Sequence, residues 1–312
     1  MLFIHAICHA QGYPSRTITV VVPSSPGGGL DLLARAFAQE MGRQMGQTVI
    51  VDNKPGAGGI LAVQAVRNAA PDGYTLLVTH SAPIINTPHL FTKVPYVVRR
   101  DLAFVSEIAM GRVVLAVNHG VPARNMQELL AWAARNKGKV SYGSYGVGSF
   151  GHLAGAYLNQ ARGLDMTHVA YKSEAPMVQD LSAGQIAWGI SSLATLTPHI
   201  ESGKVRPLAV FGDRRIKSLP NVPTIAETGL TDPQLKPVGW VGMLAPAGTP
   251  AAILARLERE AQKAARSAPV RTRLETFDSE LIGSTAAEFK REFEATEPVV
   301  KRLIEMAGAK AD

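Results

Sequence analysis

Residues 17–31 read TITVVVPSSPGGGLD, in which a short β-branched run passes through three glycines directly into a helical pattern. Apolar residues from Leu33 to Met45 follow at four-residue spacing, the period of one face of an α-helix. The glycines let the backbone turn sharply and bring N–H groups close to a ligand at the helix start, where the macrodipole favours an anion. A carboxylate suits such a site. The alternative is a plain strand-to-helix turn in which Asp31 caps the helix.

A second loop of the same kind occupies residues 142–151, which read YGSYGVGSFG. It also follows a short strand pattern and opens a helix near His152. Ser144 and Ser149 add hydroxyl groups that can hydrogen-bond a carboxylate at this helix start. Two anion-suited loops on separate α/β units are most economically explained by two lobes that close on one small ligand.

This second loop also matches the G-x-G-x-x-G pattern of dinucleotide-binding folds through Gly146, Gly148 and Gly151. In such folds an acidic residue at the end of the next strand, about 20 residues further on, binds the ribose. Residues 168–172 read HVAYK at that place and contain no acid. A nucleotide-dependent oxidoreductase therefore remains an alternative hypothesis that lacks its ribose-binding residue.

Short β-branched runs alternate with helical patterns along the chain, which predicts an α/β fold with largely parallel strands. Helical patterns dominate between residues 250 and 307, and the chain of 312 residues is long enough for two domains. Because no flexible linker composition separates them, we expect ordered crossings that act as a hinge. The predicted strands cover residues 17–22, 48–52, 74–79, 113–117, 141–143, 186–191 and 207–211.

The composition excludes several classes of function. The formal charge is +7, but Lys and Arg form no basic run, so we predict no nucleic-acid partner. The single cysteine, Cys8, leaves the body of the protein without a disulfide or a cysteine metal site. The motifs of serine hydrolases, zinc proteases, redox proteins and P-loop NTPases are absent, and the histidines show no metal-site spacing. We therefore predict a protein that is not an enzyme, with no catalytic residues, no cofactor and no metal ion.

Residues 1–12 begin with a short, mostly apolar run that ends in Cys8-His9-Ala10. Small residues near a cleavage point are typical of a secretory signal, although no positively charged segment precedes this run. We interpret residues 1–12 as the remnant of such a signal and predict a periplasmic protein. No later stretch of sequence approaches the roughly 18 apolar residues of a membrane span.

An ordered series of short motifs resembles the Bug family, the substrate-binding proteins of tripartite tricarboxylate transporters. The resemblance extends from Tyr13 to nearly the end of the chain. Its marks are YPSR at 13–16, PGGGLD at 26–31, NKPGAGG at 53–59, PDGYTL at 71–76, YGS at 142–144, HLA at 152–154, HVAYK at 168–172, GKVRPLA at 203–209, LPNVPT at 219–224 and APAGTP at 245–250.

This resemblance implies a periplasmic binding protein fold of type II, with two α/β lobes and a ligand cleft between them. It places lobe 1 at residues 13–117 and 238–312 and lobe 2 at residues 118–237, with crossings near Val117 and Pro237. It further implies a receptor that binds a small carboxylate, largely through main-chain N–H groups and water, and delivers it to the membrane permease subunits of the transporter. We expect a monomer. A receptor that presents its ligand to a sensor protein is a third hypothesis.

The resemblance also carries a set of ligand-binding positions onto this chain. Two departures from the family pattern bear on the ligand. Ser173 and Glu174 replace a usual glycine and its neutral neighbour, so Glu174 would repel a second carboxylate if it faced the cleft. Ser191 stands where aspartate is common, which gives no support to amine recognition there. The predicted ligand-binding residues are Gly27, Gly28, Gly29, Ser81, Ala82, Ser144, Gly148, Ser149, Phe150, Ser173 and Ser191.

Overall fold

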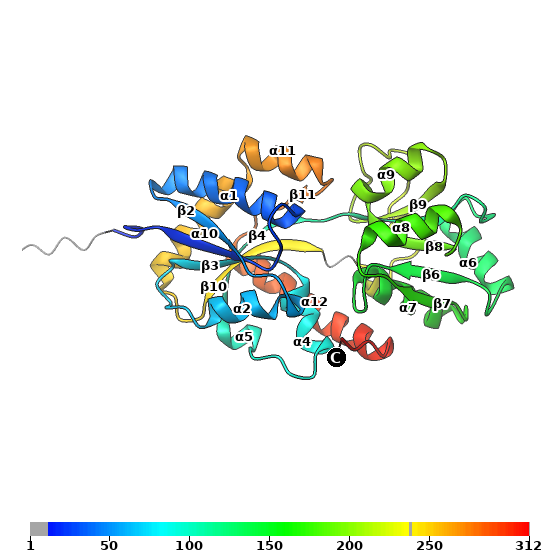
Figure 1. The fold of residues 1–312 in the computed structure, drawn as a ribbon, viewed down its shortest axis with the longest axis horizontal. Helices are drawn as coiled ribbons and strands as arrows, with labels where there is room; N and C mark the ends of the chain where they lie inside the picture. Colours follow the sequence, from blue (N-terminus) through cyan, green and yellow to red (C-terminus); the bar gives the residue numbers. More distant parts are fainter. Residues whose placement is uncertain (1–11, 237–238, 312) are drawn as a thin grey trace, which may run out of the picture.

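The computed structural model describes residues 12–236 and 239–311. The predicted secretory remnant therefore lies almost entirely outside the described residues, as does the predicted return crossing at Pro237. The chain forms two α/β lobes side by side along the long axis of the molecule, each built on its own sheet (Figure 1). None of the helices in the described part of the chain is long and apolar enough to cross a membrane.

The first sheet has six strands in the order β11-β4-β10-β3-β1-β2. β1 pairs in parallel with β2 and β3, whereas β10 is antiparallel to β3 and β4, and β11 is antiparallel to β4. The strands are β1 (Ile18–Val22), β2 (Val49–Asn53), β3 (Thr75–His80), β4 (Leu102–Met110), β10 (Trp240–Pro246) and β11 (Glu280–Leu281).

The second sheet has five strands in the order β7-β6-β8-β5-β9. β6 is parallel to β7 and β8, and β5 is antiparallel to β8 and β9. The prediction of largely parallel strands is therefore wrong, since both sheets are mixed. The strands are β5 (Val113–Asn118), β6 (Ser141–Ser144), β7 (Thr167–Ala170), β8 (Trp188–Ser192) and β9 (Val205–Phe211).

Helices cover both faces of each sheet. In the first lobe α1, α10 and α11 share one apolar core with the sheet, and α2 and α12 share the other. In the second lobe α6 and α7 cover one face, and α8 and α9 cover the other. The helices are α1 (Gly29–Met45), η1 (Ala57–Gly59), α2 (Ile60–Arg67), α3 (Ala82–Ile85), α4 (Thr87–Leu90), α5 (Val98–Asp101), α6 (Met126–Arg135), α7 (Phe150–Arg162), α8 (Glu174–Ala183), α9 (Leu193–Glu201), η2 (Ala226–Thr228), η3 (Pro233–Leu235), α10 (Ala251–Ala265), α11 (Ala268–Thr276) and α12 (Ala286–Met306).

The apolar stripe predicted after the first glycine-rich loop is confirmed in α1. Leu33, Phe37 and Met41 are buried against the first sheet, and Met45 closes the same face. The helix ends at Gly46, which adopts the left-handed conformation (φ 67°) that a helix C-terminus commonly requires. The first strand, its loop and this helix thus form as the sequence indicates, which positions the loop at one edge of the sheet.

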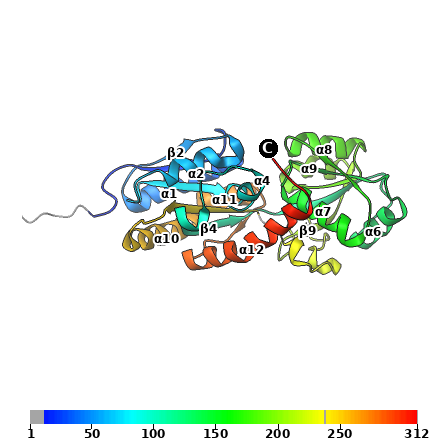
Figure 2. The same ribbon diagram turned by 90° about the horizontal axis from the view of Figure 1, so that it is seen from below.

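The two segments that join the lobes contact each other. The Gly111 N–H donates a hydrogen bond of 2.9 Å to the Gly239 carbonyl, and a Cβ atom at Gly111 would stand 3.1 Å from that oxygen. β5 follows at once and belongs to the second sheet, although the sequence assigned residues 113–117 to the first lobe. The other lobe boundaries remain a prediction. α12 runs from beneath the first lobe to α7 of the second lobe (Figure 2).

Replacing Gly155 in α7 by Ala has two opposite effects on the free energy of unfolding, one from helix propensity and one from packing. Alanine favours a helix interior over glycine by about 1 kcal/mol, but a Cβ atom here would stand 2.1 Å from Cε2 of the buried Tyr142 ring. Overpacking of this kind costs about 1–3 kcal/mol, so we expect Gly155→Ala to lower the free energy of unfolding, measured by urea titration. Ala161→Gly, on an exposed face of the same helix, measures the propensity effect alone. A Gly155→Ala variant as stable as the parent would contradict this packing.

Candidate functional site

The predicted site residues lie at the carboxyl ends of parallel strands in both lobes. Gly27–Gly29 follow β1, and Ser81 and Ala82 follow the neighbouring parallel strand β3. In the second lobe Ser144 ends β6 and Gly148–Phe150 follow it, while the other predicted positions follow β7 or lie near the end of β8, both parallel to β6. β1 and β6 point toward the opposite lobe from either side (Figure 1). Ligands of open α/β sheets bind at such carboxyl ends.

Asp31 holds the first glycine-rich loop in place from within. Its buried carboxylate accepts hydrogen bonds from the Gly27 N–H (2.8 Å), Arg35 Nε (3.0 Å) and Asn53 Nδ2 (2.9 Å). Burial alone would raise the pKa of Asp31, but these three partners outweigh it and lower the pKa to about 2. The Gly27 N–H, predicted as a ligand contact, therefore binds Asp31 within the loop. The N–H groups without intrahelical partners are those of the first turn of α1, from Gly29 onward.

Asn53, at the end of β2, is a positioning residue that the sequence analysis did not assign to the site. Its Nδ2 also donates to the Ser24 carbonyl (3.0 Å), which ties the loop before α1 to β2. Gly59, in the NKPGAGG stretch, has φ 88°, and a Cβ atom there would stand 2.4 Å from the Pro83 ring. The NKPGAGG stretch therefore supports both the loop before α1 and the loop after β3. The sequence signal that could have identified Asn53 is an asparagine at a strand end beside these glycines.

The second glycine-rich loop is held by its own side chains and by two histidines. Ser149 is the N-cap of α7, and its Oγ accepts a 3.4 Å hydrogen bond from the His152 N–H. The Gly148 N–H donates to His152 Nδ1 at 3.0 Å. The buried Ser144 hydroxyl hydrogen-bonds the Gly146 carbonyl (3.0 Å) and pairs with His168 Nε2 (2.8 Å). Ser144 thus fixes the loop, although the sequence predicted it as a ligand contact.

His152 and His168 stack face to face, with ring centroids 3.9 Å apart. Burial lowers the pKa of both rings, and the neighbouring His152 adds to the effect on His168, whose pKa falls to about 4. His152 Nδ1 accepts a hydrogen bond from Gly148 and therefore carries no proton. The spacing of the histidines in the sequence gives no sign of a site, whereas the fold brings these two together beneath the loop.

Glu174 places a fixed negative charge beside the predicted positions of the second lobe. Its carboxylate accepts hydrogen bonds from the Ser192 N–H (3.3 Å), from the Ser192 hydroxyl and from Thr195 Oγ1 (2.9 Å), so the first residue of α8 caps α9. Ser173 is exposed at the start of α8. Ser191 is fully buried at the end of β8, and its hydroxyl has no hydrogen-bond partner among the described residues.

Tyr145 covers the start of α7. Burial raises the pKa of its phenol, the Glu174 carboxylate adds to this rise, and the N–H groups of Phe150 and Gly151 act in the opposite direction through hydrogen bonds. The phenol therefore interacts with the first N–H groups of α7, the helix start at which a carboxylate is predicted. This tyrosine was quoted within the loop motif but was not predicted as a site residue.

The lobes meet directly at the second loop. Asn86 Nδ2, between α3 and α4, donates a 2.8 Å hydrogen bond to the Gly148 carbonyl. A Cβ atom at Gly148, where φ is 74°, would stand 2.3 Å from Leu90 of the first lobe. Gly148 is therefore required for close approach of the lobes. Asn86 was not predicted, because only the tertiary structure shows that it reaches across.

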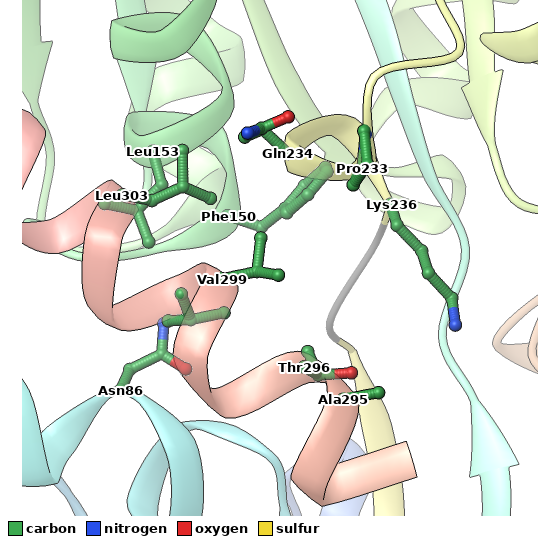
Figure 3. A pocket seen from close by; sticks show the side chains of 11 residues that line it. Asn86, Phe150, Leu153, Pro233, Gln234, Lys236, Ala295, Thr296, Val299 and Leu303 are labelled. Atoms are coloured by element: carbon green, nitrogen blue, oxygen red, sulfur yellow. The ribbon is translucent and has the colours of Figure 1, made fainter.

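A pocket that opens to solvent lies between the lobes but away from most of the predicted residues. Its volume is about 210 Å³, and Phe150 is the only predicted site residue among the described residues that line it (Figure 3). Within residues 12–236 and 239–311, no three His, Cys, Asp or Glu side chains group as a metal site requires. The remaining lining residues are Asn86, Leu153, Pro233, Gln234, Lys236, Ala295, Thr296, Val299, Val300 and Leu303.

The depressed pKa of His168 makes stability depend on pH in a defined direction. The folded state resists protonation down to about pH 4, whereas the unfolded chain takes up the proton near its ordinary pKa of 6.5. This contribution to stability is therefore complete above about pH 6.5 and is lost as the pH falls toward 4. We expect His168→Gln, which keeps a polar partner for Ser144, to lose less stability over this range in urea titrations. An unchanged pH dependence would contradict the assignment.

Comparison with known proteins places these features in a family. The model of the tripartite tricarboxylate transporter family receptor matches residues 33–308. The chain is 34% identical over 268 residues to Protein BugT of Bordetella pertussis, which covers 86% of this chain and 82% of that protein.

Solved structures agree with this match and confirm the predicted two-lobed periplasmic binding protein fold. The periplasmic binding protein BugD has a TM-score of 0.74 at 29% identity, covering 96% of this chain and 99% of that one. MatC of Rhodopseudomonas palustris, solved with bound malate, has a TM-score of 0.71 at 31% identity, covering 92% and 100%. An R. palustris protein solved with adipate has a TM-score of 0.78 at 30% identity, covering 96% and 99%. The chain therefore belongs to the tripartite tricarboxylate transporter receptor family.

Proposed function

We propose that this chain is an extracytoplasmic solute receptor that binds a small carboxylate between its two lobes. The observation that carries the proposal is the placement of two helix starts, those of α1 and α7, at the carboxyl ends of parallel strands in opposite lobes. Such starts present N–H groups without intrahelical partners and the positive end of the helix dipole. Relatives solved with malate and with adipate support a carboxylate as the ligand class.

Binding begins, on this proposal, at the first turn of α1, where Asp31 and Asn53 keep the loop in shape. The other end of the ligand then takes the Phe150 and Gly151 N–H groups of α7 and displaces the Tyr145 phenol from them. The lobes move about the paired segments at Gly111 and Gly239. The permease subunits of the transporter then bind the closed form, which the ligand favours because it contacts both lobes. The receptor is periplasmic and acts as a monomer.

A nucleotide-dependent oxidoreductase is less well supported. β6, α7 and β7 form a parallel strand-helix-strand unit, as a dinucleotide site requires. The end of this unit, from Ala170 to Lys172, supplies no acidic side chain for a ribose. The family is one of receptors, and we propose that the chain catalyses no reaction.

Substituting Gly28, the N-cap of α1, tests the first anchor. A Cβ atom fits there at 3.4 Å from the Ser25 carbonyl, so the fold tolerates a side chain. Leucine, however, would cover the N–H groups of the first turn. We expect Gly28→Leu to weaken carboxylate binding by at least about tenfold, or ~1.4 kcal/mol, in calorimetric titrations with a panel that includes malate and adipate.

The matched control for this experiment is Gln39→Leu, which adds the same side chain on an exposed face of α1 away from the helix start. The control variant should bind like the parent chain. Equal affinity of Gly28→Leu and the parent for every carboxylate that binds would remove α1 from the site. A thermal shift of the parent with NAD and with no carboxylate would instead favour the oxidoreductase.

The charge of Glu174 tests the anchor in the second lobe. Because Glu174 acts on Tyr145 at the start of α7, it opposes a second negative charge there. We expect Glu174→Gln, which keeps an acceptor for Ser192 and Thr195, to strengthen dicarboxylate binding by about tenfold relative to monocarboxylate binding. The ratio of the two affinities in calorimetry is the readout. If the ratio stays constant, Glu174 does not face the ligand.

A further inference from the structure

Glu107 is a buried carboxylate in the middle of β4, where the nearby Val105 and Ile108 are apolar and fully buried. Only 4% of Glu107 is exposed. The backbone is held on both sides, because β10 pairs with one edge of β4 and Ser284 Oγ accepts a 2.9 Å hydrogen bond from the Glu107 N–H at the other. A fixed strand therefore keeps this acidic side chain inside the protein.

No described residue donates a hydrogen bond to the Glu107 carboxylate. Burial raises its pKa to about 7, the Glu292 carboxylate adds to this rise, and Lys236 acts in the opposite direction. Lys236 is not its hydrogen-bond partner, because its Nζ contacts both carboxylate oxygens of Glu292 at 3.1 Å. A buried acceptor without a donor is costly, so a molecule that brings a charged donor gains a strong hydrogen bond.

Glu107 lines a pocket of about 200 Å³ beside the two segments that join the lobes. Both lobes contribute to this pocket: β4, β11 and α12 from the first, and the turn after β9 from the second. Asp213 is exposed at its rim, so the pocket is open to solvent. Neither carboxylate oxygen of Glu107 is fully enclosed, so a molecule in the pocket can reach them. Among the described residues that line it, none belongs to the predicted carboxylate site.

The basic side chains around this pocket are already paired. Arg112 Nη2 donates to Glu280 at 2.7 Å, and Arg214 contacts the same carboxylate. Lys236 is held by its ion pair with α12, and its side chain extends away from the apolar inter-lobe pocket described above (Figure 3). An anion would have to compete with these ion pairs and would lie close to the Glu107 carboxylate. The pocket therefore disfavours a carboxylate ligand.

A cation meets the opposite situation in this pocket. The carboxylates of Glu107 and Asp213 form no ion pair with any described residue, and Met110 and Ile282 supply apolar walls beside them. Within residues 12–236 and 239–311, no three acidic, histidine or cysteine side chains group as a metal ion requires. The lining therefore suits a cation that has a hydrocarbon part, instead of a metal ion.

We propose that this pocket binds a small primary alkylammonium ion, whose charged group donates hydrogen bonds to the Glu107 carboxylate. The chain of the ion lies against Met110 and Ile282, and Asp213 adds negative charge at the rim. An engineered apolar cavity of about 150 Å³ holds benzene, so a volume of about 200 Å³ leaves room for a chain of several carbons. This site is separate from the proposed carboxylate site, and titrations with malate and adipate measure the latter independently.

Butylammonium and 1-butanol form a matched pair of probes, because they share the same chain and only the first carries a charge. We expect butylammonium to bind the full chain saturably in calorimetry at about pH 8, with Kd about 1 mM or tighter. Butanol should bind at least about tenfold more weakly. Glu107→Gln keeps the shape of the side chain and removes its charge, so it should lower butylammonium affinity to the level of butanol.

The binding should also depend on pH in one direction. The alkylammonium stays charged below about pH 10, whereas Glu107 must lose its proton to bind it, and that pKa is about 7. Affinity is therefore highest above pH 7 and is lost as the pH falls below it. We expect butylammonium affinity to fall about tenfold between about pH 8 and about pH 6.

The matched control is Glu201→Gln, which removes the same charge from an exposed side chain at the end of α9 and should bind like the parent. If Glu107→Gln fails to fold by circular dichroism, Ile282→Trp fills the pocket instead and should abolish binding. The proposal is overturned if butylammonium shows no saturable binding up to about 10 mM, if butanol binds equally well, if the variant that folds binds like the parent, or if the affinity is the same at both pH values.

Discussion

The first N–H groups of α1 and α7 have no partners within their own helices. The arrangement of both lobes depends on which other groups these N–H groups contact. In the first lobe Asp31 takes the N–H of the preceding loop at Gly27 and leaves the helix turn itself open. In the second lobe the phenol of Tyr145 interacts with the N–H groups of this turn. Parallel strand pairing brings both turns to sheet edges that point toward the opposite lobe.

Two carboxylates of the chain itself hold the scaffold in place by accepting hydrogen bonds. Asp31 and Glu174 each accept several hydrogen bonds at a helix start, and each thereby fixes a loop or a helix beside the proposed carboxylate site. On the proposed function, Glu174 also acts as an electrostatic filter, because its carboxylate acts on Tyr145 at the start of α7. Neutral His152 and His168 complete this support, since a proton on His152 Nδ1 would remove the acceptor of the Gly148 N–H.

Local patterns predicted the two strand-loop-helix units, because their glycines and apolar spacing are determined within a few residues. β4 and β10 were missed, and with them the mixed character of the first sheet, because their antiparallel pairing joins segments more than a hundred residues apart. In the second sheet β5, β8 and β9 were predicted as strands, but their antiparallel pairing was not. The sequence predicted Ser144 and Gly27 as site residues, but it could not predict their hydrogen-bond partners, His168 and Asp31, which depend on packing. The hydrogen bond from Asn86 to Gly148 between the lobes likewise has no sequence signal, because residue spacing alone cannot show which loops are in contact.

Amide hydrogen exchange of the first turns of α1 and α7, with and without a bound carboxylate, tests the central claim most directly. If one ligand is held by both helix starts, the amides of Gly29 and Leu30 and those of Phe150 and Gly151 should all become protected together at saturating ligand. Protection confined to one lobe, or absent from both turns while the ligand is demonstrably bound, would contradict the account.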